Sequence, residues 1–341
     1  MNTPPDQNRE VRLLNRPGGM PAPGDFEVVE TAIPTPREGQ VLVRNSFISV
    51  DPYMRGRMND QKSYVPPFQL GETLTGGAVG EVVVSQSPNH KPGDFVFSNF
   101  GWRQWYVADA AEVQHIDPSL GPIQSYLGAL GMTGLTAYAG LLEVAELKGG
   151  ERVFVSAASG AVGAIVCQIA KAKGCYVVGS VGSDEKAAYL KNETGTDRTI
   201  NYKTCEAPQD LTQAVAAAFP EGIDVYFDNV GGAHLQAAIA NMRPFGRIAA
   251  CGMISQYNAT EPTPGPNNLV NIVGMRLTLR GFIVGDHLAL RLDFLRDMAQ
   301  WVKSGKMKWR ETIASGIDKA PEAFIGLFKG EHIGKMLVQV G

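Results

Sequence analysis

Short apolar runs alternate with stretches of helical periodicity in the second half of the chain. The apolar runs cover residues 152–156, 175–181, 223–227, 246–250 and 277–284. Between the first two runs, apolar residues recur at helical spacing, which predicts a helix from about Ala161 to Lys173 that stops at Gly174. Strands without polar alternation, each followed by a helix, are typical of a doubly wound parallel sheet. We therefore predict an α/β domain of the Rossmann type over residues 126–305.

The first part of the chain has a different pattern, in which short strand-like runs are separated by turns. These runs cover residues 41–50, 77–84, 95–97 and 105–108. Many short strands with little helix indicate a mainly β, partly open barrel over residues 1–125. A helical pattern begins near Tyr126, and the tail from Met307 returns to short mixed elements and ends in a strand over residues 335–340.

The first buried strand of the α/β region is followed by a glycine turn, Ala158-x-Gly160-x-x-Gly163, a variant of G-x-G-x-x-G with alanine at the first position. Gly160 allows the backbone to approach a pyrophosphate, and Gly163 allows the helix to pack closely on the strand. The helix N-terminus offers N–H groups to the phosphates. A tight turn without a ligand is the alternative, but the flanking strand and helix favour a dinucleotide site.

The second strand of this region indicates which dinucleotide binds. NAD sites carry Asp or Glu near the end of this strand, and that carboxylate would repel a 2′-phosphate. Here the strand ends in Gly179-Ser-Val-Gly-Ser183 without an acid, and Asp184 and Glu185 come one step later, at a predicted helix start. Lys186 can pair with a 2′-phosphate, and Ser183 can donate a hydrogen bond to it. A solvated helix face is the alternative for residues 184–186, and we favour NADP over NAD.

In an open parallel sheet, ligands bind at the carboxyl ends of the strands. Those ends carry mostly small or polar residues, at positions 158–160, 182–184, 228–230, 251–253 and 282–284. Tyr257 follows one of these ends and can donate a hydrogen bond near a nicotinamide. Tyr53 follows the restricted Asp51-Pro52 step and can project from a turn of the first domain, although an ordinary half-buried aromatic residue is an equal alternative.

Composition and charge exclude several classes of function. The chain has 341 residues and a formal net charge of -3, so nothing favours a nucleic-acid or membrane partner. No apolar run is long enough to span a bilayer, and the polar N-terminus lacks the apolar core of a signal peptide. The four cysteines show no C-x-x-C spacing, which indicates reduced thiols and a cytoplasmic location. None of the five histidines stands in a metal-binding motif, so we expect no metal.

Distinct motifs are spread over nearly the whole chain. They are Asp51-Pro-Tyr-Met-Arg-Gly-Arg-Met58, Gly131-Met-Thr-Gly-Leu-Thr-Ala-Tyr138, Ala157-Ala-Ser-Gly-Ala-Val-Gly163, Val181-Gly-Ser-Asp-Glu-Lys186, Phe227-Asp-Asn-Val-Gly-Gly232, Cys251-Gly-Met-Ile-Ser-Gln-Tyr-Asn258 and Gly334-Lys335. With these motifs the chain resembles the zinc-independent double-bond reductases of the medium-chain dehydrogenase/reductase superfamily: prostaglandin reductases, plant alkenal reductases and, most closely, bacterial NADPH-dependent curcumin reductases. Zinc alcohol dehydrogenases of the superfamily carry Gly-His-Glu, whereas the similar place here reads Leu70-Gly-Glu-Thr73, without the histidine.

The resemblance implies a GroES-like substrate domain of residues 1–125 and 306–341 and an NADP-binding domain of residues 126–305. It implies that Gly160, Ala161, Val162 and Gly163 bind the pyrophosphate and that Lys186 and Tyr202 hold the 2′-phosphate. The positions expected around the ribose and the nicotinamide are Met132, Thr133, Asn229, Cys251, Gly252, Tyr257, Phe282, Ile283 and Val284. Tyr53 and Tyr64 are expected to line the substrate pocket. Relatives often carry Asn where His332 stands, and they are often homodimers, which we also expect here.

The resemblance implies reduction of the C=C bond of α,β-unsaturated ketones or aldehydes by NADPH, with hydride transfer to the β-carbon and without metal. We expect Tyr257 to hydrogen-bond the ribose 2′-hydroxyl and so to stabilise the enolate, with a direct contact from Tyr53 to the carbonyl as the alternative. Two other functions stay open. One is a quinone reductase with the same cofactor site, and the other is an NADPH-binding protein without catalysis.

Overall fold

The computed structural model describes residues 7–340, which divide into two compact units. The first unit contains the chain up to Leu127, the segment Glu311–His332 and the last strand from Met336. The second unit contains Gly128–Arg310 together with Ile333–Lys335. The chain therefore contributes to the second unit twice, once with a long segment and once with three residues.

A parallel sheet with the strand order β10-β9-β8-β11-β12-β13 forms the centre of the second unit. Its strands are β8 (Arg152–Val155), β9 (Tyr176–Val181), β10 (Arg198–Asn201), β11 (Ile223–Asp228), β12 (Met242–Ala250) and β13 (Thr278–Gly281). This is the strand order of the dinucleotide-binding fold, and the direction of winding reverses between β8 and β11. The predicted doubly wound sheet is confirmed.

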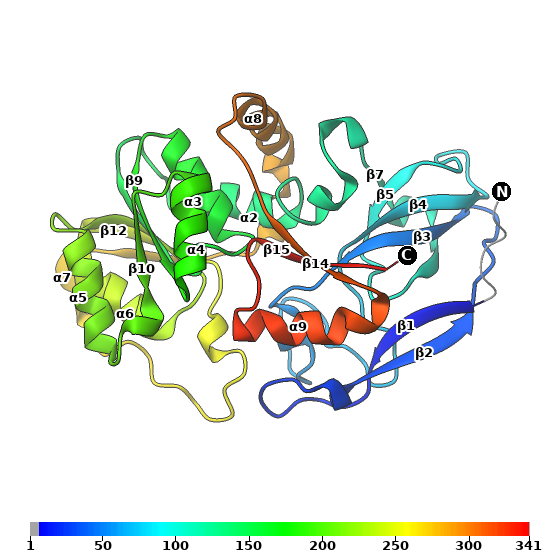
Figure 1. Cartoon of the computed structure of the whole chain (residues 1–341), viewed down its shortest axis with the longest axis horizontal. Coiled ribbons are helices and arrows are strands. Elements are labelled where there is room, and N and C mark those ends of the chain that lie inside the picture. Colours follow the sequence, from blue (N-terminus) through cyan, green and yellow to red (C-terminus); the bar gives the residue numbers. More distant parts are fainter. Residues whose placement is uncertain (1–6, 341) are drawn as a thin grey trace. The chain divides into compact units, whose positions relative to one another are not determined.

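Helices cover both faces of this sheet (Figure 1). One face carries α3 (Gly163–Ala172) and α4 (Asp184–Tyr189), and the other carries α5 (Pro208–Ala218), α6 (Gly232–Asn241) and α7 (Val270–Met275). The unit also contains α2 (Met132–Ala139) and α8 (Arg291–Lys303). Because both faces are covered, β8 and β9 are buried almost throughout, and this is why they appear in the sequence as continuous apolar runs.

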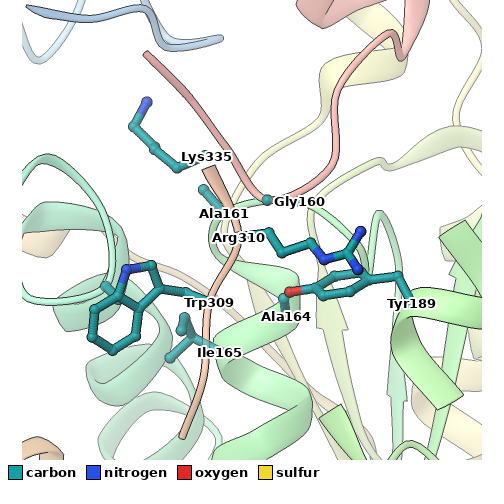
Figure 2. A pocket seen from close by; sticks show the side chains of 10 residues that line it. Gly160, Ala161, Ala164, Ile165, Tyr189, Trp309, Arg310 and Lys335 are labelled. Atoms are coloured by element: carbon teal, nitrogen blue, oxygen red, sulfur yellow. The ribbon is translucent and has the colours of Figure 1, made fainter. Parts of the chain in front are cut away.

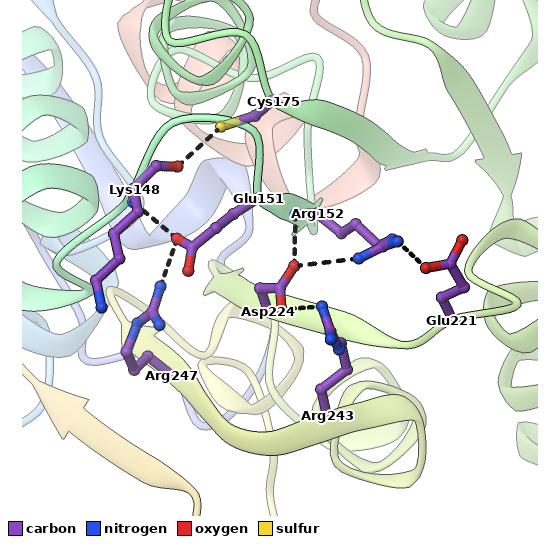
Figure 3. A network of polar contacts seen from close by, with 8 residues as sticks. All are labelled: Lys148, Glu151, Arg152, Cys175, Glu221, Asp224, Arg243 and Arg247. Atoms are coloured by element: carbon purple, nitrogen blue, oxygen red, sulfur yellow. Dashed lines mark hydrogen bonds and ion pairs between the residues drawn. The ribbon is translucent and has the colours of Figure 1, made fainter.

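Charged side chains gather where β8, β11 and β12 begin (Figure 3). Asp224 accepts a hydrogen bond from the Arg152 N–H at 2.9 Å and pairs with Arg243 at 2.9 Å. Arg247 pairs with Glu151 at 2.5 Å. The Asp224, Glu151 and Arg247 side chains are only 15%, 16% and 19% exposed, so solvent screens these pairs weakly. The amino edge of the sheet is thus held by charges that satisfy one another.

The first unit is mainly antiparallel β structure, as predicted. Its larger sheet has the order β14-β15-β3-β4-β5-β7, and β6 also pairs with β3. The strands are β3 (Gln40–Ser49), β4 (Ala78–Ser85), β5 (Phe95–Ser98), β6 (Trp105–Asp109), β7 (Gln114–His115), β14 (Glu311–Ser315) and β15 (Lys335–Gln339). Register shifts after Leu42 and after Asn45 interrupt the pairing of β3 with β4 and bend the sheet.

The core of the first unit includes elements that the sequence patterns did not reveal. They are the hairpin of β1 (Gln7–Leu13) with β2 (Phe26–Ala32), the short α1 (Met54–Arg57) and α9 (Ala320–Lys329). Phe26 from the hairpin stacks on Trp102 with ring centres 6.0 Å apart and meets Phe324 of α9 edge-on at 6.2 Å. These three rings join the hairpin and α9 in one apolar cluster.

Several predicted boundaries differ from the structure. Helix α3 begins at Gly163 rather than near Ala161, because the residues before it form the turn. The strand expected over residues 277–284 is only β13, so residues 282–284 lie after the strand. The helix expected from Tyr126 is divided into a 3-10 helix, Ile123–Leu127, and α2.

Candidate functional site

The turn after β8 is held in a conformation that few side chains permit. Ala157 has φ +46°, in the left-handed region that residues other than glycine rarely adopt. A Cβ on Gly163 would stand 2.5 Å from the Ala157 carbonyl oxygen and 2.7 Å from the Ala158 Cα, so the helix approaches the strand this closely only with glycine. At Gly160 the nearest atom would be 3.3 Å away. A side chain at Gly160 would thus meet the Ala157 carbonyl oxygen in a tight contact, although a less severe one than at Gly163.

Helix α3 begins with backbone N–H groups that have no protein partner. Within residues 7–340, the N–H groups of Ala161 and Val162 donate to no acceptor. The first bond that closes the helical turn runs from the Ala164 N–H to the Gly160 carbonyl at 3.0 Å. Unpaired amides at the positive end of a helix dipole bind anions. These residues fit a pyrophosphate.

The segment Ile333–Lys335 packs against the glycine turn (Figure 2). The Gly334 N–H donates to the Ser159 carbonyl at 2.8 Å, and a Cβ on Gly334 would stand 2.0 Å from the Arg310 carbonyl oxygen. Figure 2 shows a small hollow beside this contact, where the Arg310 guanidinium lies over the Tyr189 ring, 5.1 Å from its centre. The Gly334-Lys335 motif thus supports the turn from within the second unit.

Donor groups surround Gly182, directly after β9. The Tyr202 hydroxyl would lie 3.1 Å, and the Lys203 Cε 3.2 Å, from a Cβ on Gly182. The Ser183 hydroxyl accepts the Lys186 N–H at 3.3 Å and so caps α4. Burial, followed by the nearby charge of Lys203, lowers the pKa of Lys186. An anion bound between the two lysines would relieve their repulsion, and a 2′-phosphate is such an anion.

Buried polar groups join the ends of β8 and β11. The fully buried Asp228 accepts the N–H groups of Val230 and Gly231 at 2.9 and 2.8 Å, both through Oδ1. Its Oδ2 has no hydrogen-bond partner within the described residues, and burial raises the pKa of this carboxyl. Asn229 donates its backbone N–H to the Ser156 hydroxyl at 2.9 Å and its side-chain amide to the Ser156 carbonyl at 2.7 Å. The Asn229 side chain is thereby fixed where the winding of the sheet reverses.

The loop after β12 folds back onto the end of its own strand. The Tyr257 hydroxyl accepts the Met253 N–H at 3.3 Å and would lie 3.0 Å from a Cβ on Gly252. Gly252 therefore makes room for the phenol. The Cys251 N–H donates to the Asp228 carbonyl at 2.9 Å, and burial raises the pKa of the Cys251 thiol to about 12. The thiol is protonated at neutral pH, so Cys251 can line a site but does not act as a nucleophile.

The remaining cofactor positions differ in what they offer. Thr133, in the first turn of α2, is buried, and its Oγ1 has no hydrogen-bond partner within residues 7–340, whereas Met132 is 39% exposed. The Phe282 ring packs against Phe227 at 6.3 Å between centres. Ile283 is 38% exposed, and residue 284 begins the next 3-10 helix. Thr133 thus provides a polar atom that the protein leaves unsatisfied, whereas Phe282 provides packing.

The first unit holds the two tyrosines predicted for the substrate. Tyr53 precedes α1 and packs against the apolar core, and burial together with the Asp51 carboxylate raises the pKa of its phenol. Tyr64 is 63% exposed. Arg57 stacks on the Phe68 ring at 3.9 Å and lies close enough to both phenols to interact with their charge. Tyr53 is therefore a neutral hydrogen-bond donor at neutral pH.

No group of three or more His, Cys, Asp or Glu side chains placed to hold a metal ion occurs in residues 7–340. The buried His287 pairs instead with Glu143 at 3.2 Å, and the four cysteines are free thiols. Reaction without metal stays a prediction. In the same part of the chain no helix is both long enough and apolar enough to cross a membrane.

Comparison with known proteins identifies the class to which the chain belongs. Residues 9–116 match the family described as the N-terminal domain of oxidoreductase, and residues 161–304 match the one described as zinc-binding dehydrogenase. Together with the parallel sheet and its glycine turn, these matches define a medium-chain dehydrogenase/reductase.

Similar proteins narrow that class further. The chain is 42% identical to the NADPH-dependent curcumin reductase of Escherichia coli over 98% of this chain and 97% of the relative. It is 44% identical to the NADP(+)-dependent 2-alkenal reductase of Nicotiana tabacum, over 98% and 97% of the two chains. The crystal structure of CurA in complex with NADPH from Vibrio vulnificus matches with a TM-score of 0.92 at 39% identity, over 98% of this chain and 99% of that one. The chain belongs to the family of reductases that includes the curcumin, 2-alkenal and prostaglandin reductases.

Two residues of the candidate site were missed from the sequence. Lys203 comes directly after Tyr202 at the end of β10, beside the end of β9, and this adjacency was a usable signal. Asp228 was recognised only as a strand end. Its hydrogen bonds depend on the loop geometry after β11, which the sequence does not reveal.

Proposed function

We propose that this chain reduces the C=C bond of α,β-unsaturated ketones and aldehydes with NADPH. We assign NADPH to the second unit, and we assign contacts with the acceptor to Tyr53 and Tyr64 of the first unit. The observation that carries the proposal is the set of unsatisfied or cationic groups at the carboxyl ends of β8, β9 and β11. In an open parallel sheet this edge is where a dinucleotide binds. The relatives named as NADPH-dependent reductases of curcumin and 2-alkenals support it.

When bound, NADPH supplies the hydride. The chain's own residues bind and orient it: the Ala161 and Val162 N–H groups hold the pyrophosphate, and Lys186, Tyr202 and Lys203 hold the 2′-phosphate. The Thr133 Oγ1, which has no hydrogen-bond partner among the described residues, and the Asn229 side chain can bind polar groups at the nicotinamide end of the cofactor. Charge-assisted hydrogen bonds to a phosphate contribute about 1.5–3 kcal/mol each, so the cluster at Gly182 decides the preference for NADPH over NADH.

Reduction of an enone places negative charge on the carbonyl oxygen, so the site needs a hydrogen-bond donor for that charge. The Tyr257 hydroxyl accepts the Met253 N–H, and this bond polarises the phenol and strengthens it as a donor. We assign Tyr257 as the donor to the ribose 2′-hydroxyl, which in turn donates to the enolate oxygen. A direct contact from Tyr53, whose phenol burial keeps neutral, to the carbonyl is the alternative. Positioning of the acceptor supplies the rest of the rate enhancement.

The decisive test measures loss of NADPH absorbance with a simple enone, with its saturated ketone and with a quinone. Turnover of the enone alone, with NADH much slower, supports the proposal. Turnover of the quinone alone would favour quinone reduction instead, and tight NADPH binding without turnover of any acceptor would favour a non-catalytic protein. Oxidation of a simple alcohol that needs added zinc, without enone turnover, would contradict the proposal.

We also propose that the chain forms a homodimer through the outer edge of the parallel sheet. β13 is the last strand of that sheet, and all its residues are exposed. The helix that precedes β13 in the chain, α7, packs on β12 and exposes Val270 (75%) and Val273 (78%). An exposed edge strand with an apolar neighbour pairs well with its own copy about a two-fold axis. In light scattering, Val273→Lys is expected to give monomers. Leu292→Lys on α8, at a residue that is also exposed (81%), is expected to leave the dimer intact. Dimers in both variants would contradict this interface.

The free thiols support a reducing, cytoplasmic location.

A further inference from the structure

One buried histidine of the second unit has no role in the site described so far. His234 lies in the first turn of α6 and is only 5% exposed. Burial lowers its pKa to about 4, so the imidazole is neutral at working pH. A neutral buried imidazole needs hydrogen-bond partners of its own and can hold other groups in place.

The partner of this imidazole belongs to the strand that leads to the phosphate cluster. His234 Nε2 and the Ser180 hydroxyl are 2.8 Å apart. Ser180 is fully buried in β9, two residues before Gly182. Because both groups are excluded from water, the loss of either leaves the other unsatisfied. The imidazole is therefore fixed relative to the end of β9.

The same imidazole supports the tyrosine of the phosphate cluster. The rings of His234 and Tyr202 meet edge to face, with centres 5.1 Å apart and an angle of 74°. Tyr202 is 38% exposed, and its hydroxyl lies close to Gly182, as does the Lys203 side chain. An exposed tyrosine in a short 3-10 turn has several rotamers available, and a rigid ring behind it selects one of them.

We propose that His234 is a positioning residue for cofactor selectivity: bonded to Ser180, it holds the Tyr202 phenol where the 2′-phosphate of NADPH binds. The inference rests on the proposed NADPH site and adds to it a residue that does not touch the cofactor. His234 acts only on the part of the ligand that distinguishes NADPH from NADH, and it does not contribute to pyrophosphate binding or to hydride transfer.

Calorimetry with two nucleotides tests this without turnover. Adenosine 2′,5′-bisphosphate carries the distinguishing phosphate and AMP lacks it. We expect His234→Ala to weaken the bisphosphate roughly 3–10-fold and AMP less than about 2-fold, the range set by loss of one edge-to-face ring contact. Ser180→Ala, which removes only the anchor, should act in the same direction with a smaller effect. Equal weakening of the two nucleotides, or no change, would overturn the proposal.

A double variant separates positioning from a general structural role. If His234 works through Tyr202, then His234→Ala adds no further discrimination between the two nucleotides in a Tyr202→Ala background. The same additional loss in both backgrounds would overturn the proposal. If His234→Ala does not fold, His234→Gln and Ser180→Ala carry the test with the same expectation. Lys186→Ala tests the proposed phosphate site itself. If this variant binds both nucleotides equally more weakly, the proposed NADPH site is wrong, and so is the role of His234. If only the bisphosphate binds more weakly, the NADPH site is supported and the His234 variants alone decide the further inference.

Discussion

The two ends of the parallel sheet in the second unit are built in opposite ways. At the amino end, Glu151, Asp224 and Arg247 are paired with opposite charges at 2.5–2.9 Å. At the carboxyl end, the N–H groups of Ala161 and Val162 and the Asp228 Oδ2 have no partner within residues 7–340, and Ala157 has a strained backbone. The buried Asp228 Oδ2 without a partner and the strained Ala157 backbone cost free energy, so one end of the sheet is stabilised while the other is left incomplete. This contrast identifies the carboxyl end of the sheet as the place where a ligand binds.

Substitution at the carboxyl end should therefore impair function more than stability. The largest expected effect follows Tyr257→Phe, which keeps the ring and deletes the hydroxyl. We expect kcat with an enone to fall roughly 10–1,000-fold, as for loss of one donor to a developing oxyanion, with little change in NADPH affinity. Steady-state kinetics and fluorescence titration of NADPH measure the two quantities. Tyr53→Phe is the matched control, and an intact kcat in Tyr257→Phe together with an inactive Tyr53→Phe would reverse the two roles.

A smaller effect is expected from Lys186→Ala, because it removes one charge-assisted contact at the same end. The lost contact contributes about 1.5–3 kcal/mol to the binding free energy of NADPH, so the KM for NADPH should rise roughly 10–150-fold. The KM for NADH should change little. Lys191→Ala, another lysine of the following turn, is the control and should change neither. Equal rises for NADPH and NADH would show that Lys186 is a surface lysine and not a phosphate ligand.

Two glycines of the same turn, Gly160 and Gly163, are expected to differ in how far they affect stability and NADPH binding. Gly163→Ala introduces a Cβ 2.5 Å from the Ala157 carbonyl oxygen, so we expect both stability and NADPH affinity to fall, with about 1–3 kcal/mol lost from the free energy of unfolding. Gly160→Ala places its Cβ 3.3 Å from the same oxygen, a tight but less severe contact, so it should weaken NADPH binding with a smaller loss of stability than Gly163→Ala. Denaturation and calorimetry compare the two variants. Equal losses of stability would remove the distinction between a packing glycine and a ligand glycine.

The amino end should respond in the opposite way, with the smallest effect on function. Arg247→Met removes the ion pair with Glu151 and a hydrogen bond to the Ala145 carbonyl at 2.7 Å. We expect a loss of about 1–2 kcal/mol in the free energy of unfolding, with kcat/KM within about two-fold of the parent. Urea unfolding and kinetics on the same preparation check both. A large change in kcat/KM with unchanged stability would break the comparison between the two ends.

The sequence predicted the second unit better than the first, and the reason is physical. Strands β8 and β9 are buried on both faces, so most of their positions are apolar and the apolar signal is nearly continuous. In the first unit, β1 has buried Asn8 at a core position, where the side chain exchanges hydrogen bonds with the Trp105 backbone at 2.9 and 3.2 Å. A polar residue that is satisfied by a distant strand hides the alternation, and no local pattern corrects for it.

Helix α9 was missed although its signals were present. Pro321 stands in its first turn, Gly330 ends it with φ +71°, and apolar residues recur at helical spacing between them. In the candidate site, by contrast, several contacts have no local signal in the sequence. The glycine turn and Lys186 were proposed from local patterns, and Tyr202 was proposed from the family resemblance. The contacts of Lys203, Asp228 and His234 depend instead on neighbouring strands and loops.

The bridge between Gly160 and Gly334 has a consequence for how the protein folds. The two glycines are separated by more than half of the chain, so the loop that their contact closes is among the most costly in entropy. Such contacts form late, and the glycine turn is therefore completed only after both units have largely folded. A partly folded chain would lack this support, so that the ability to bind the dinucleotide appears together with the native topology rather than before it.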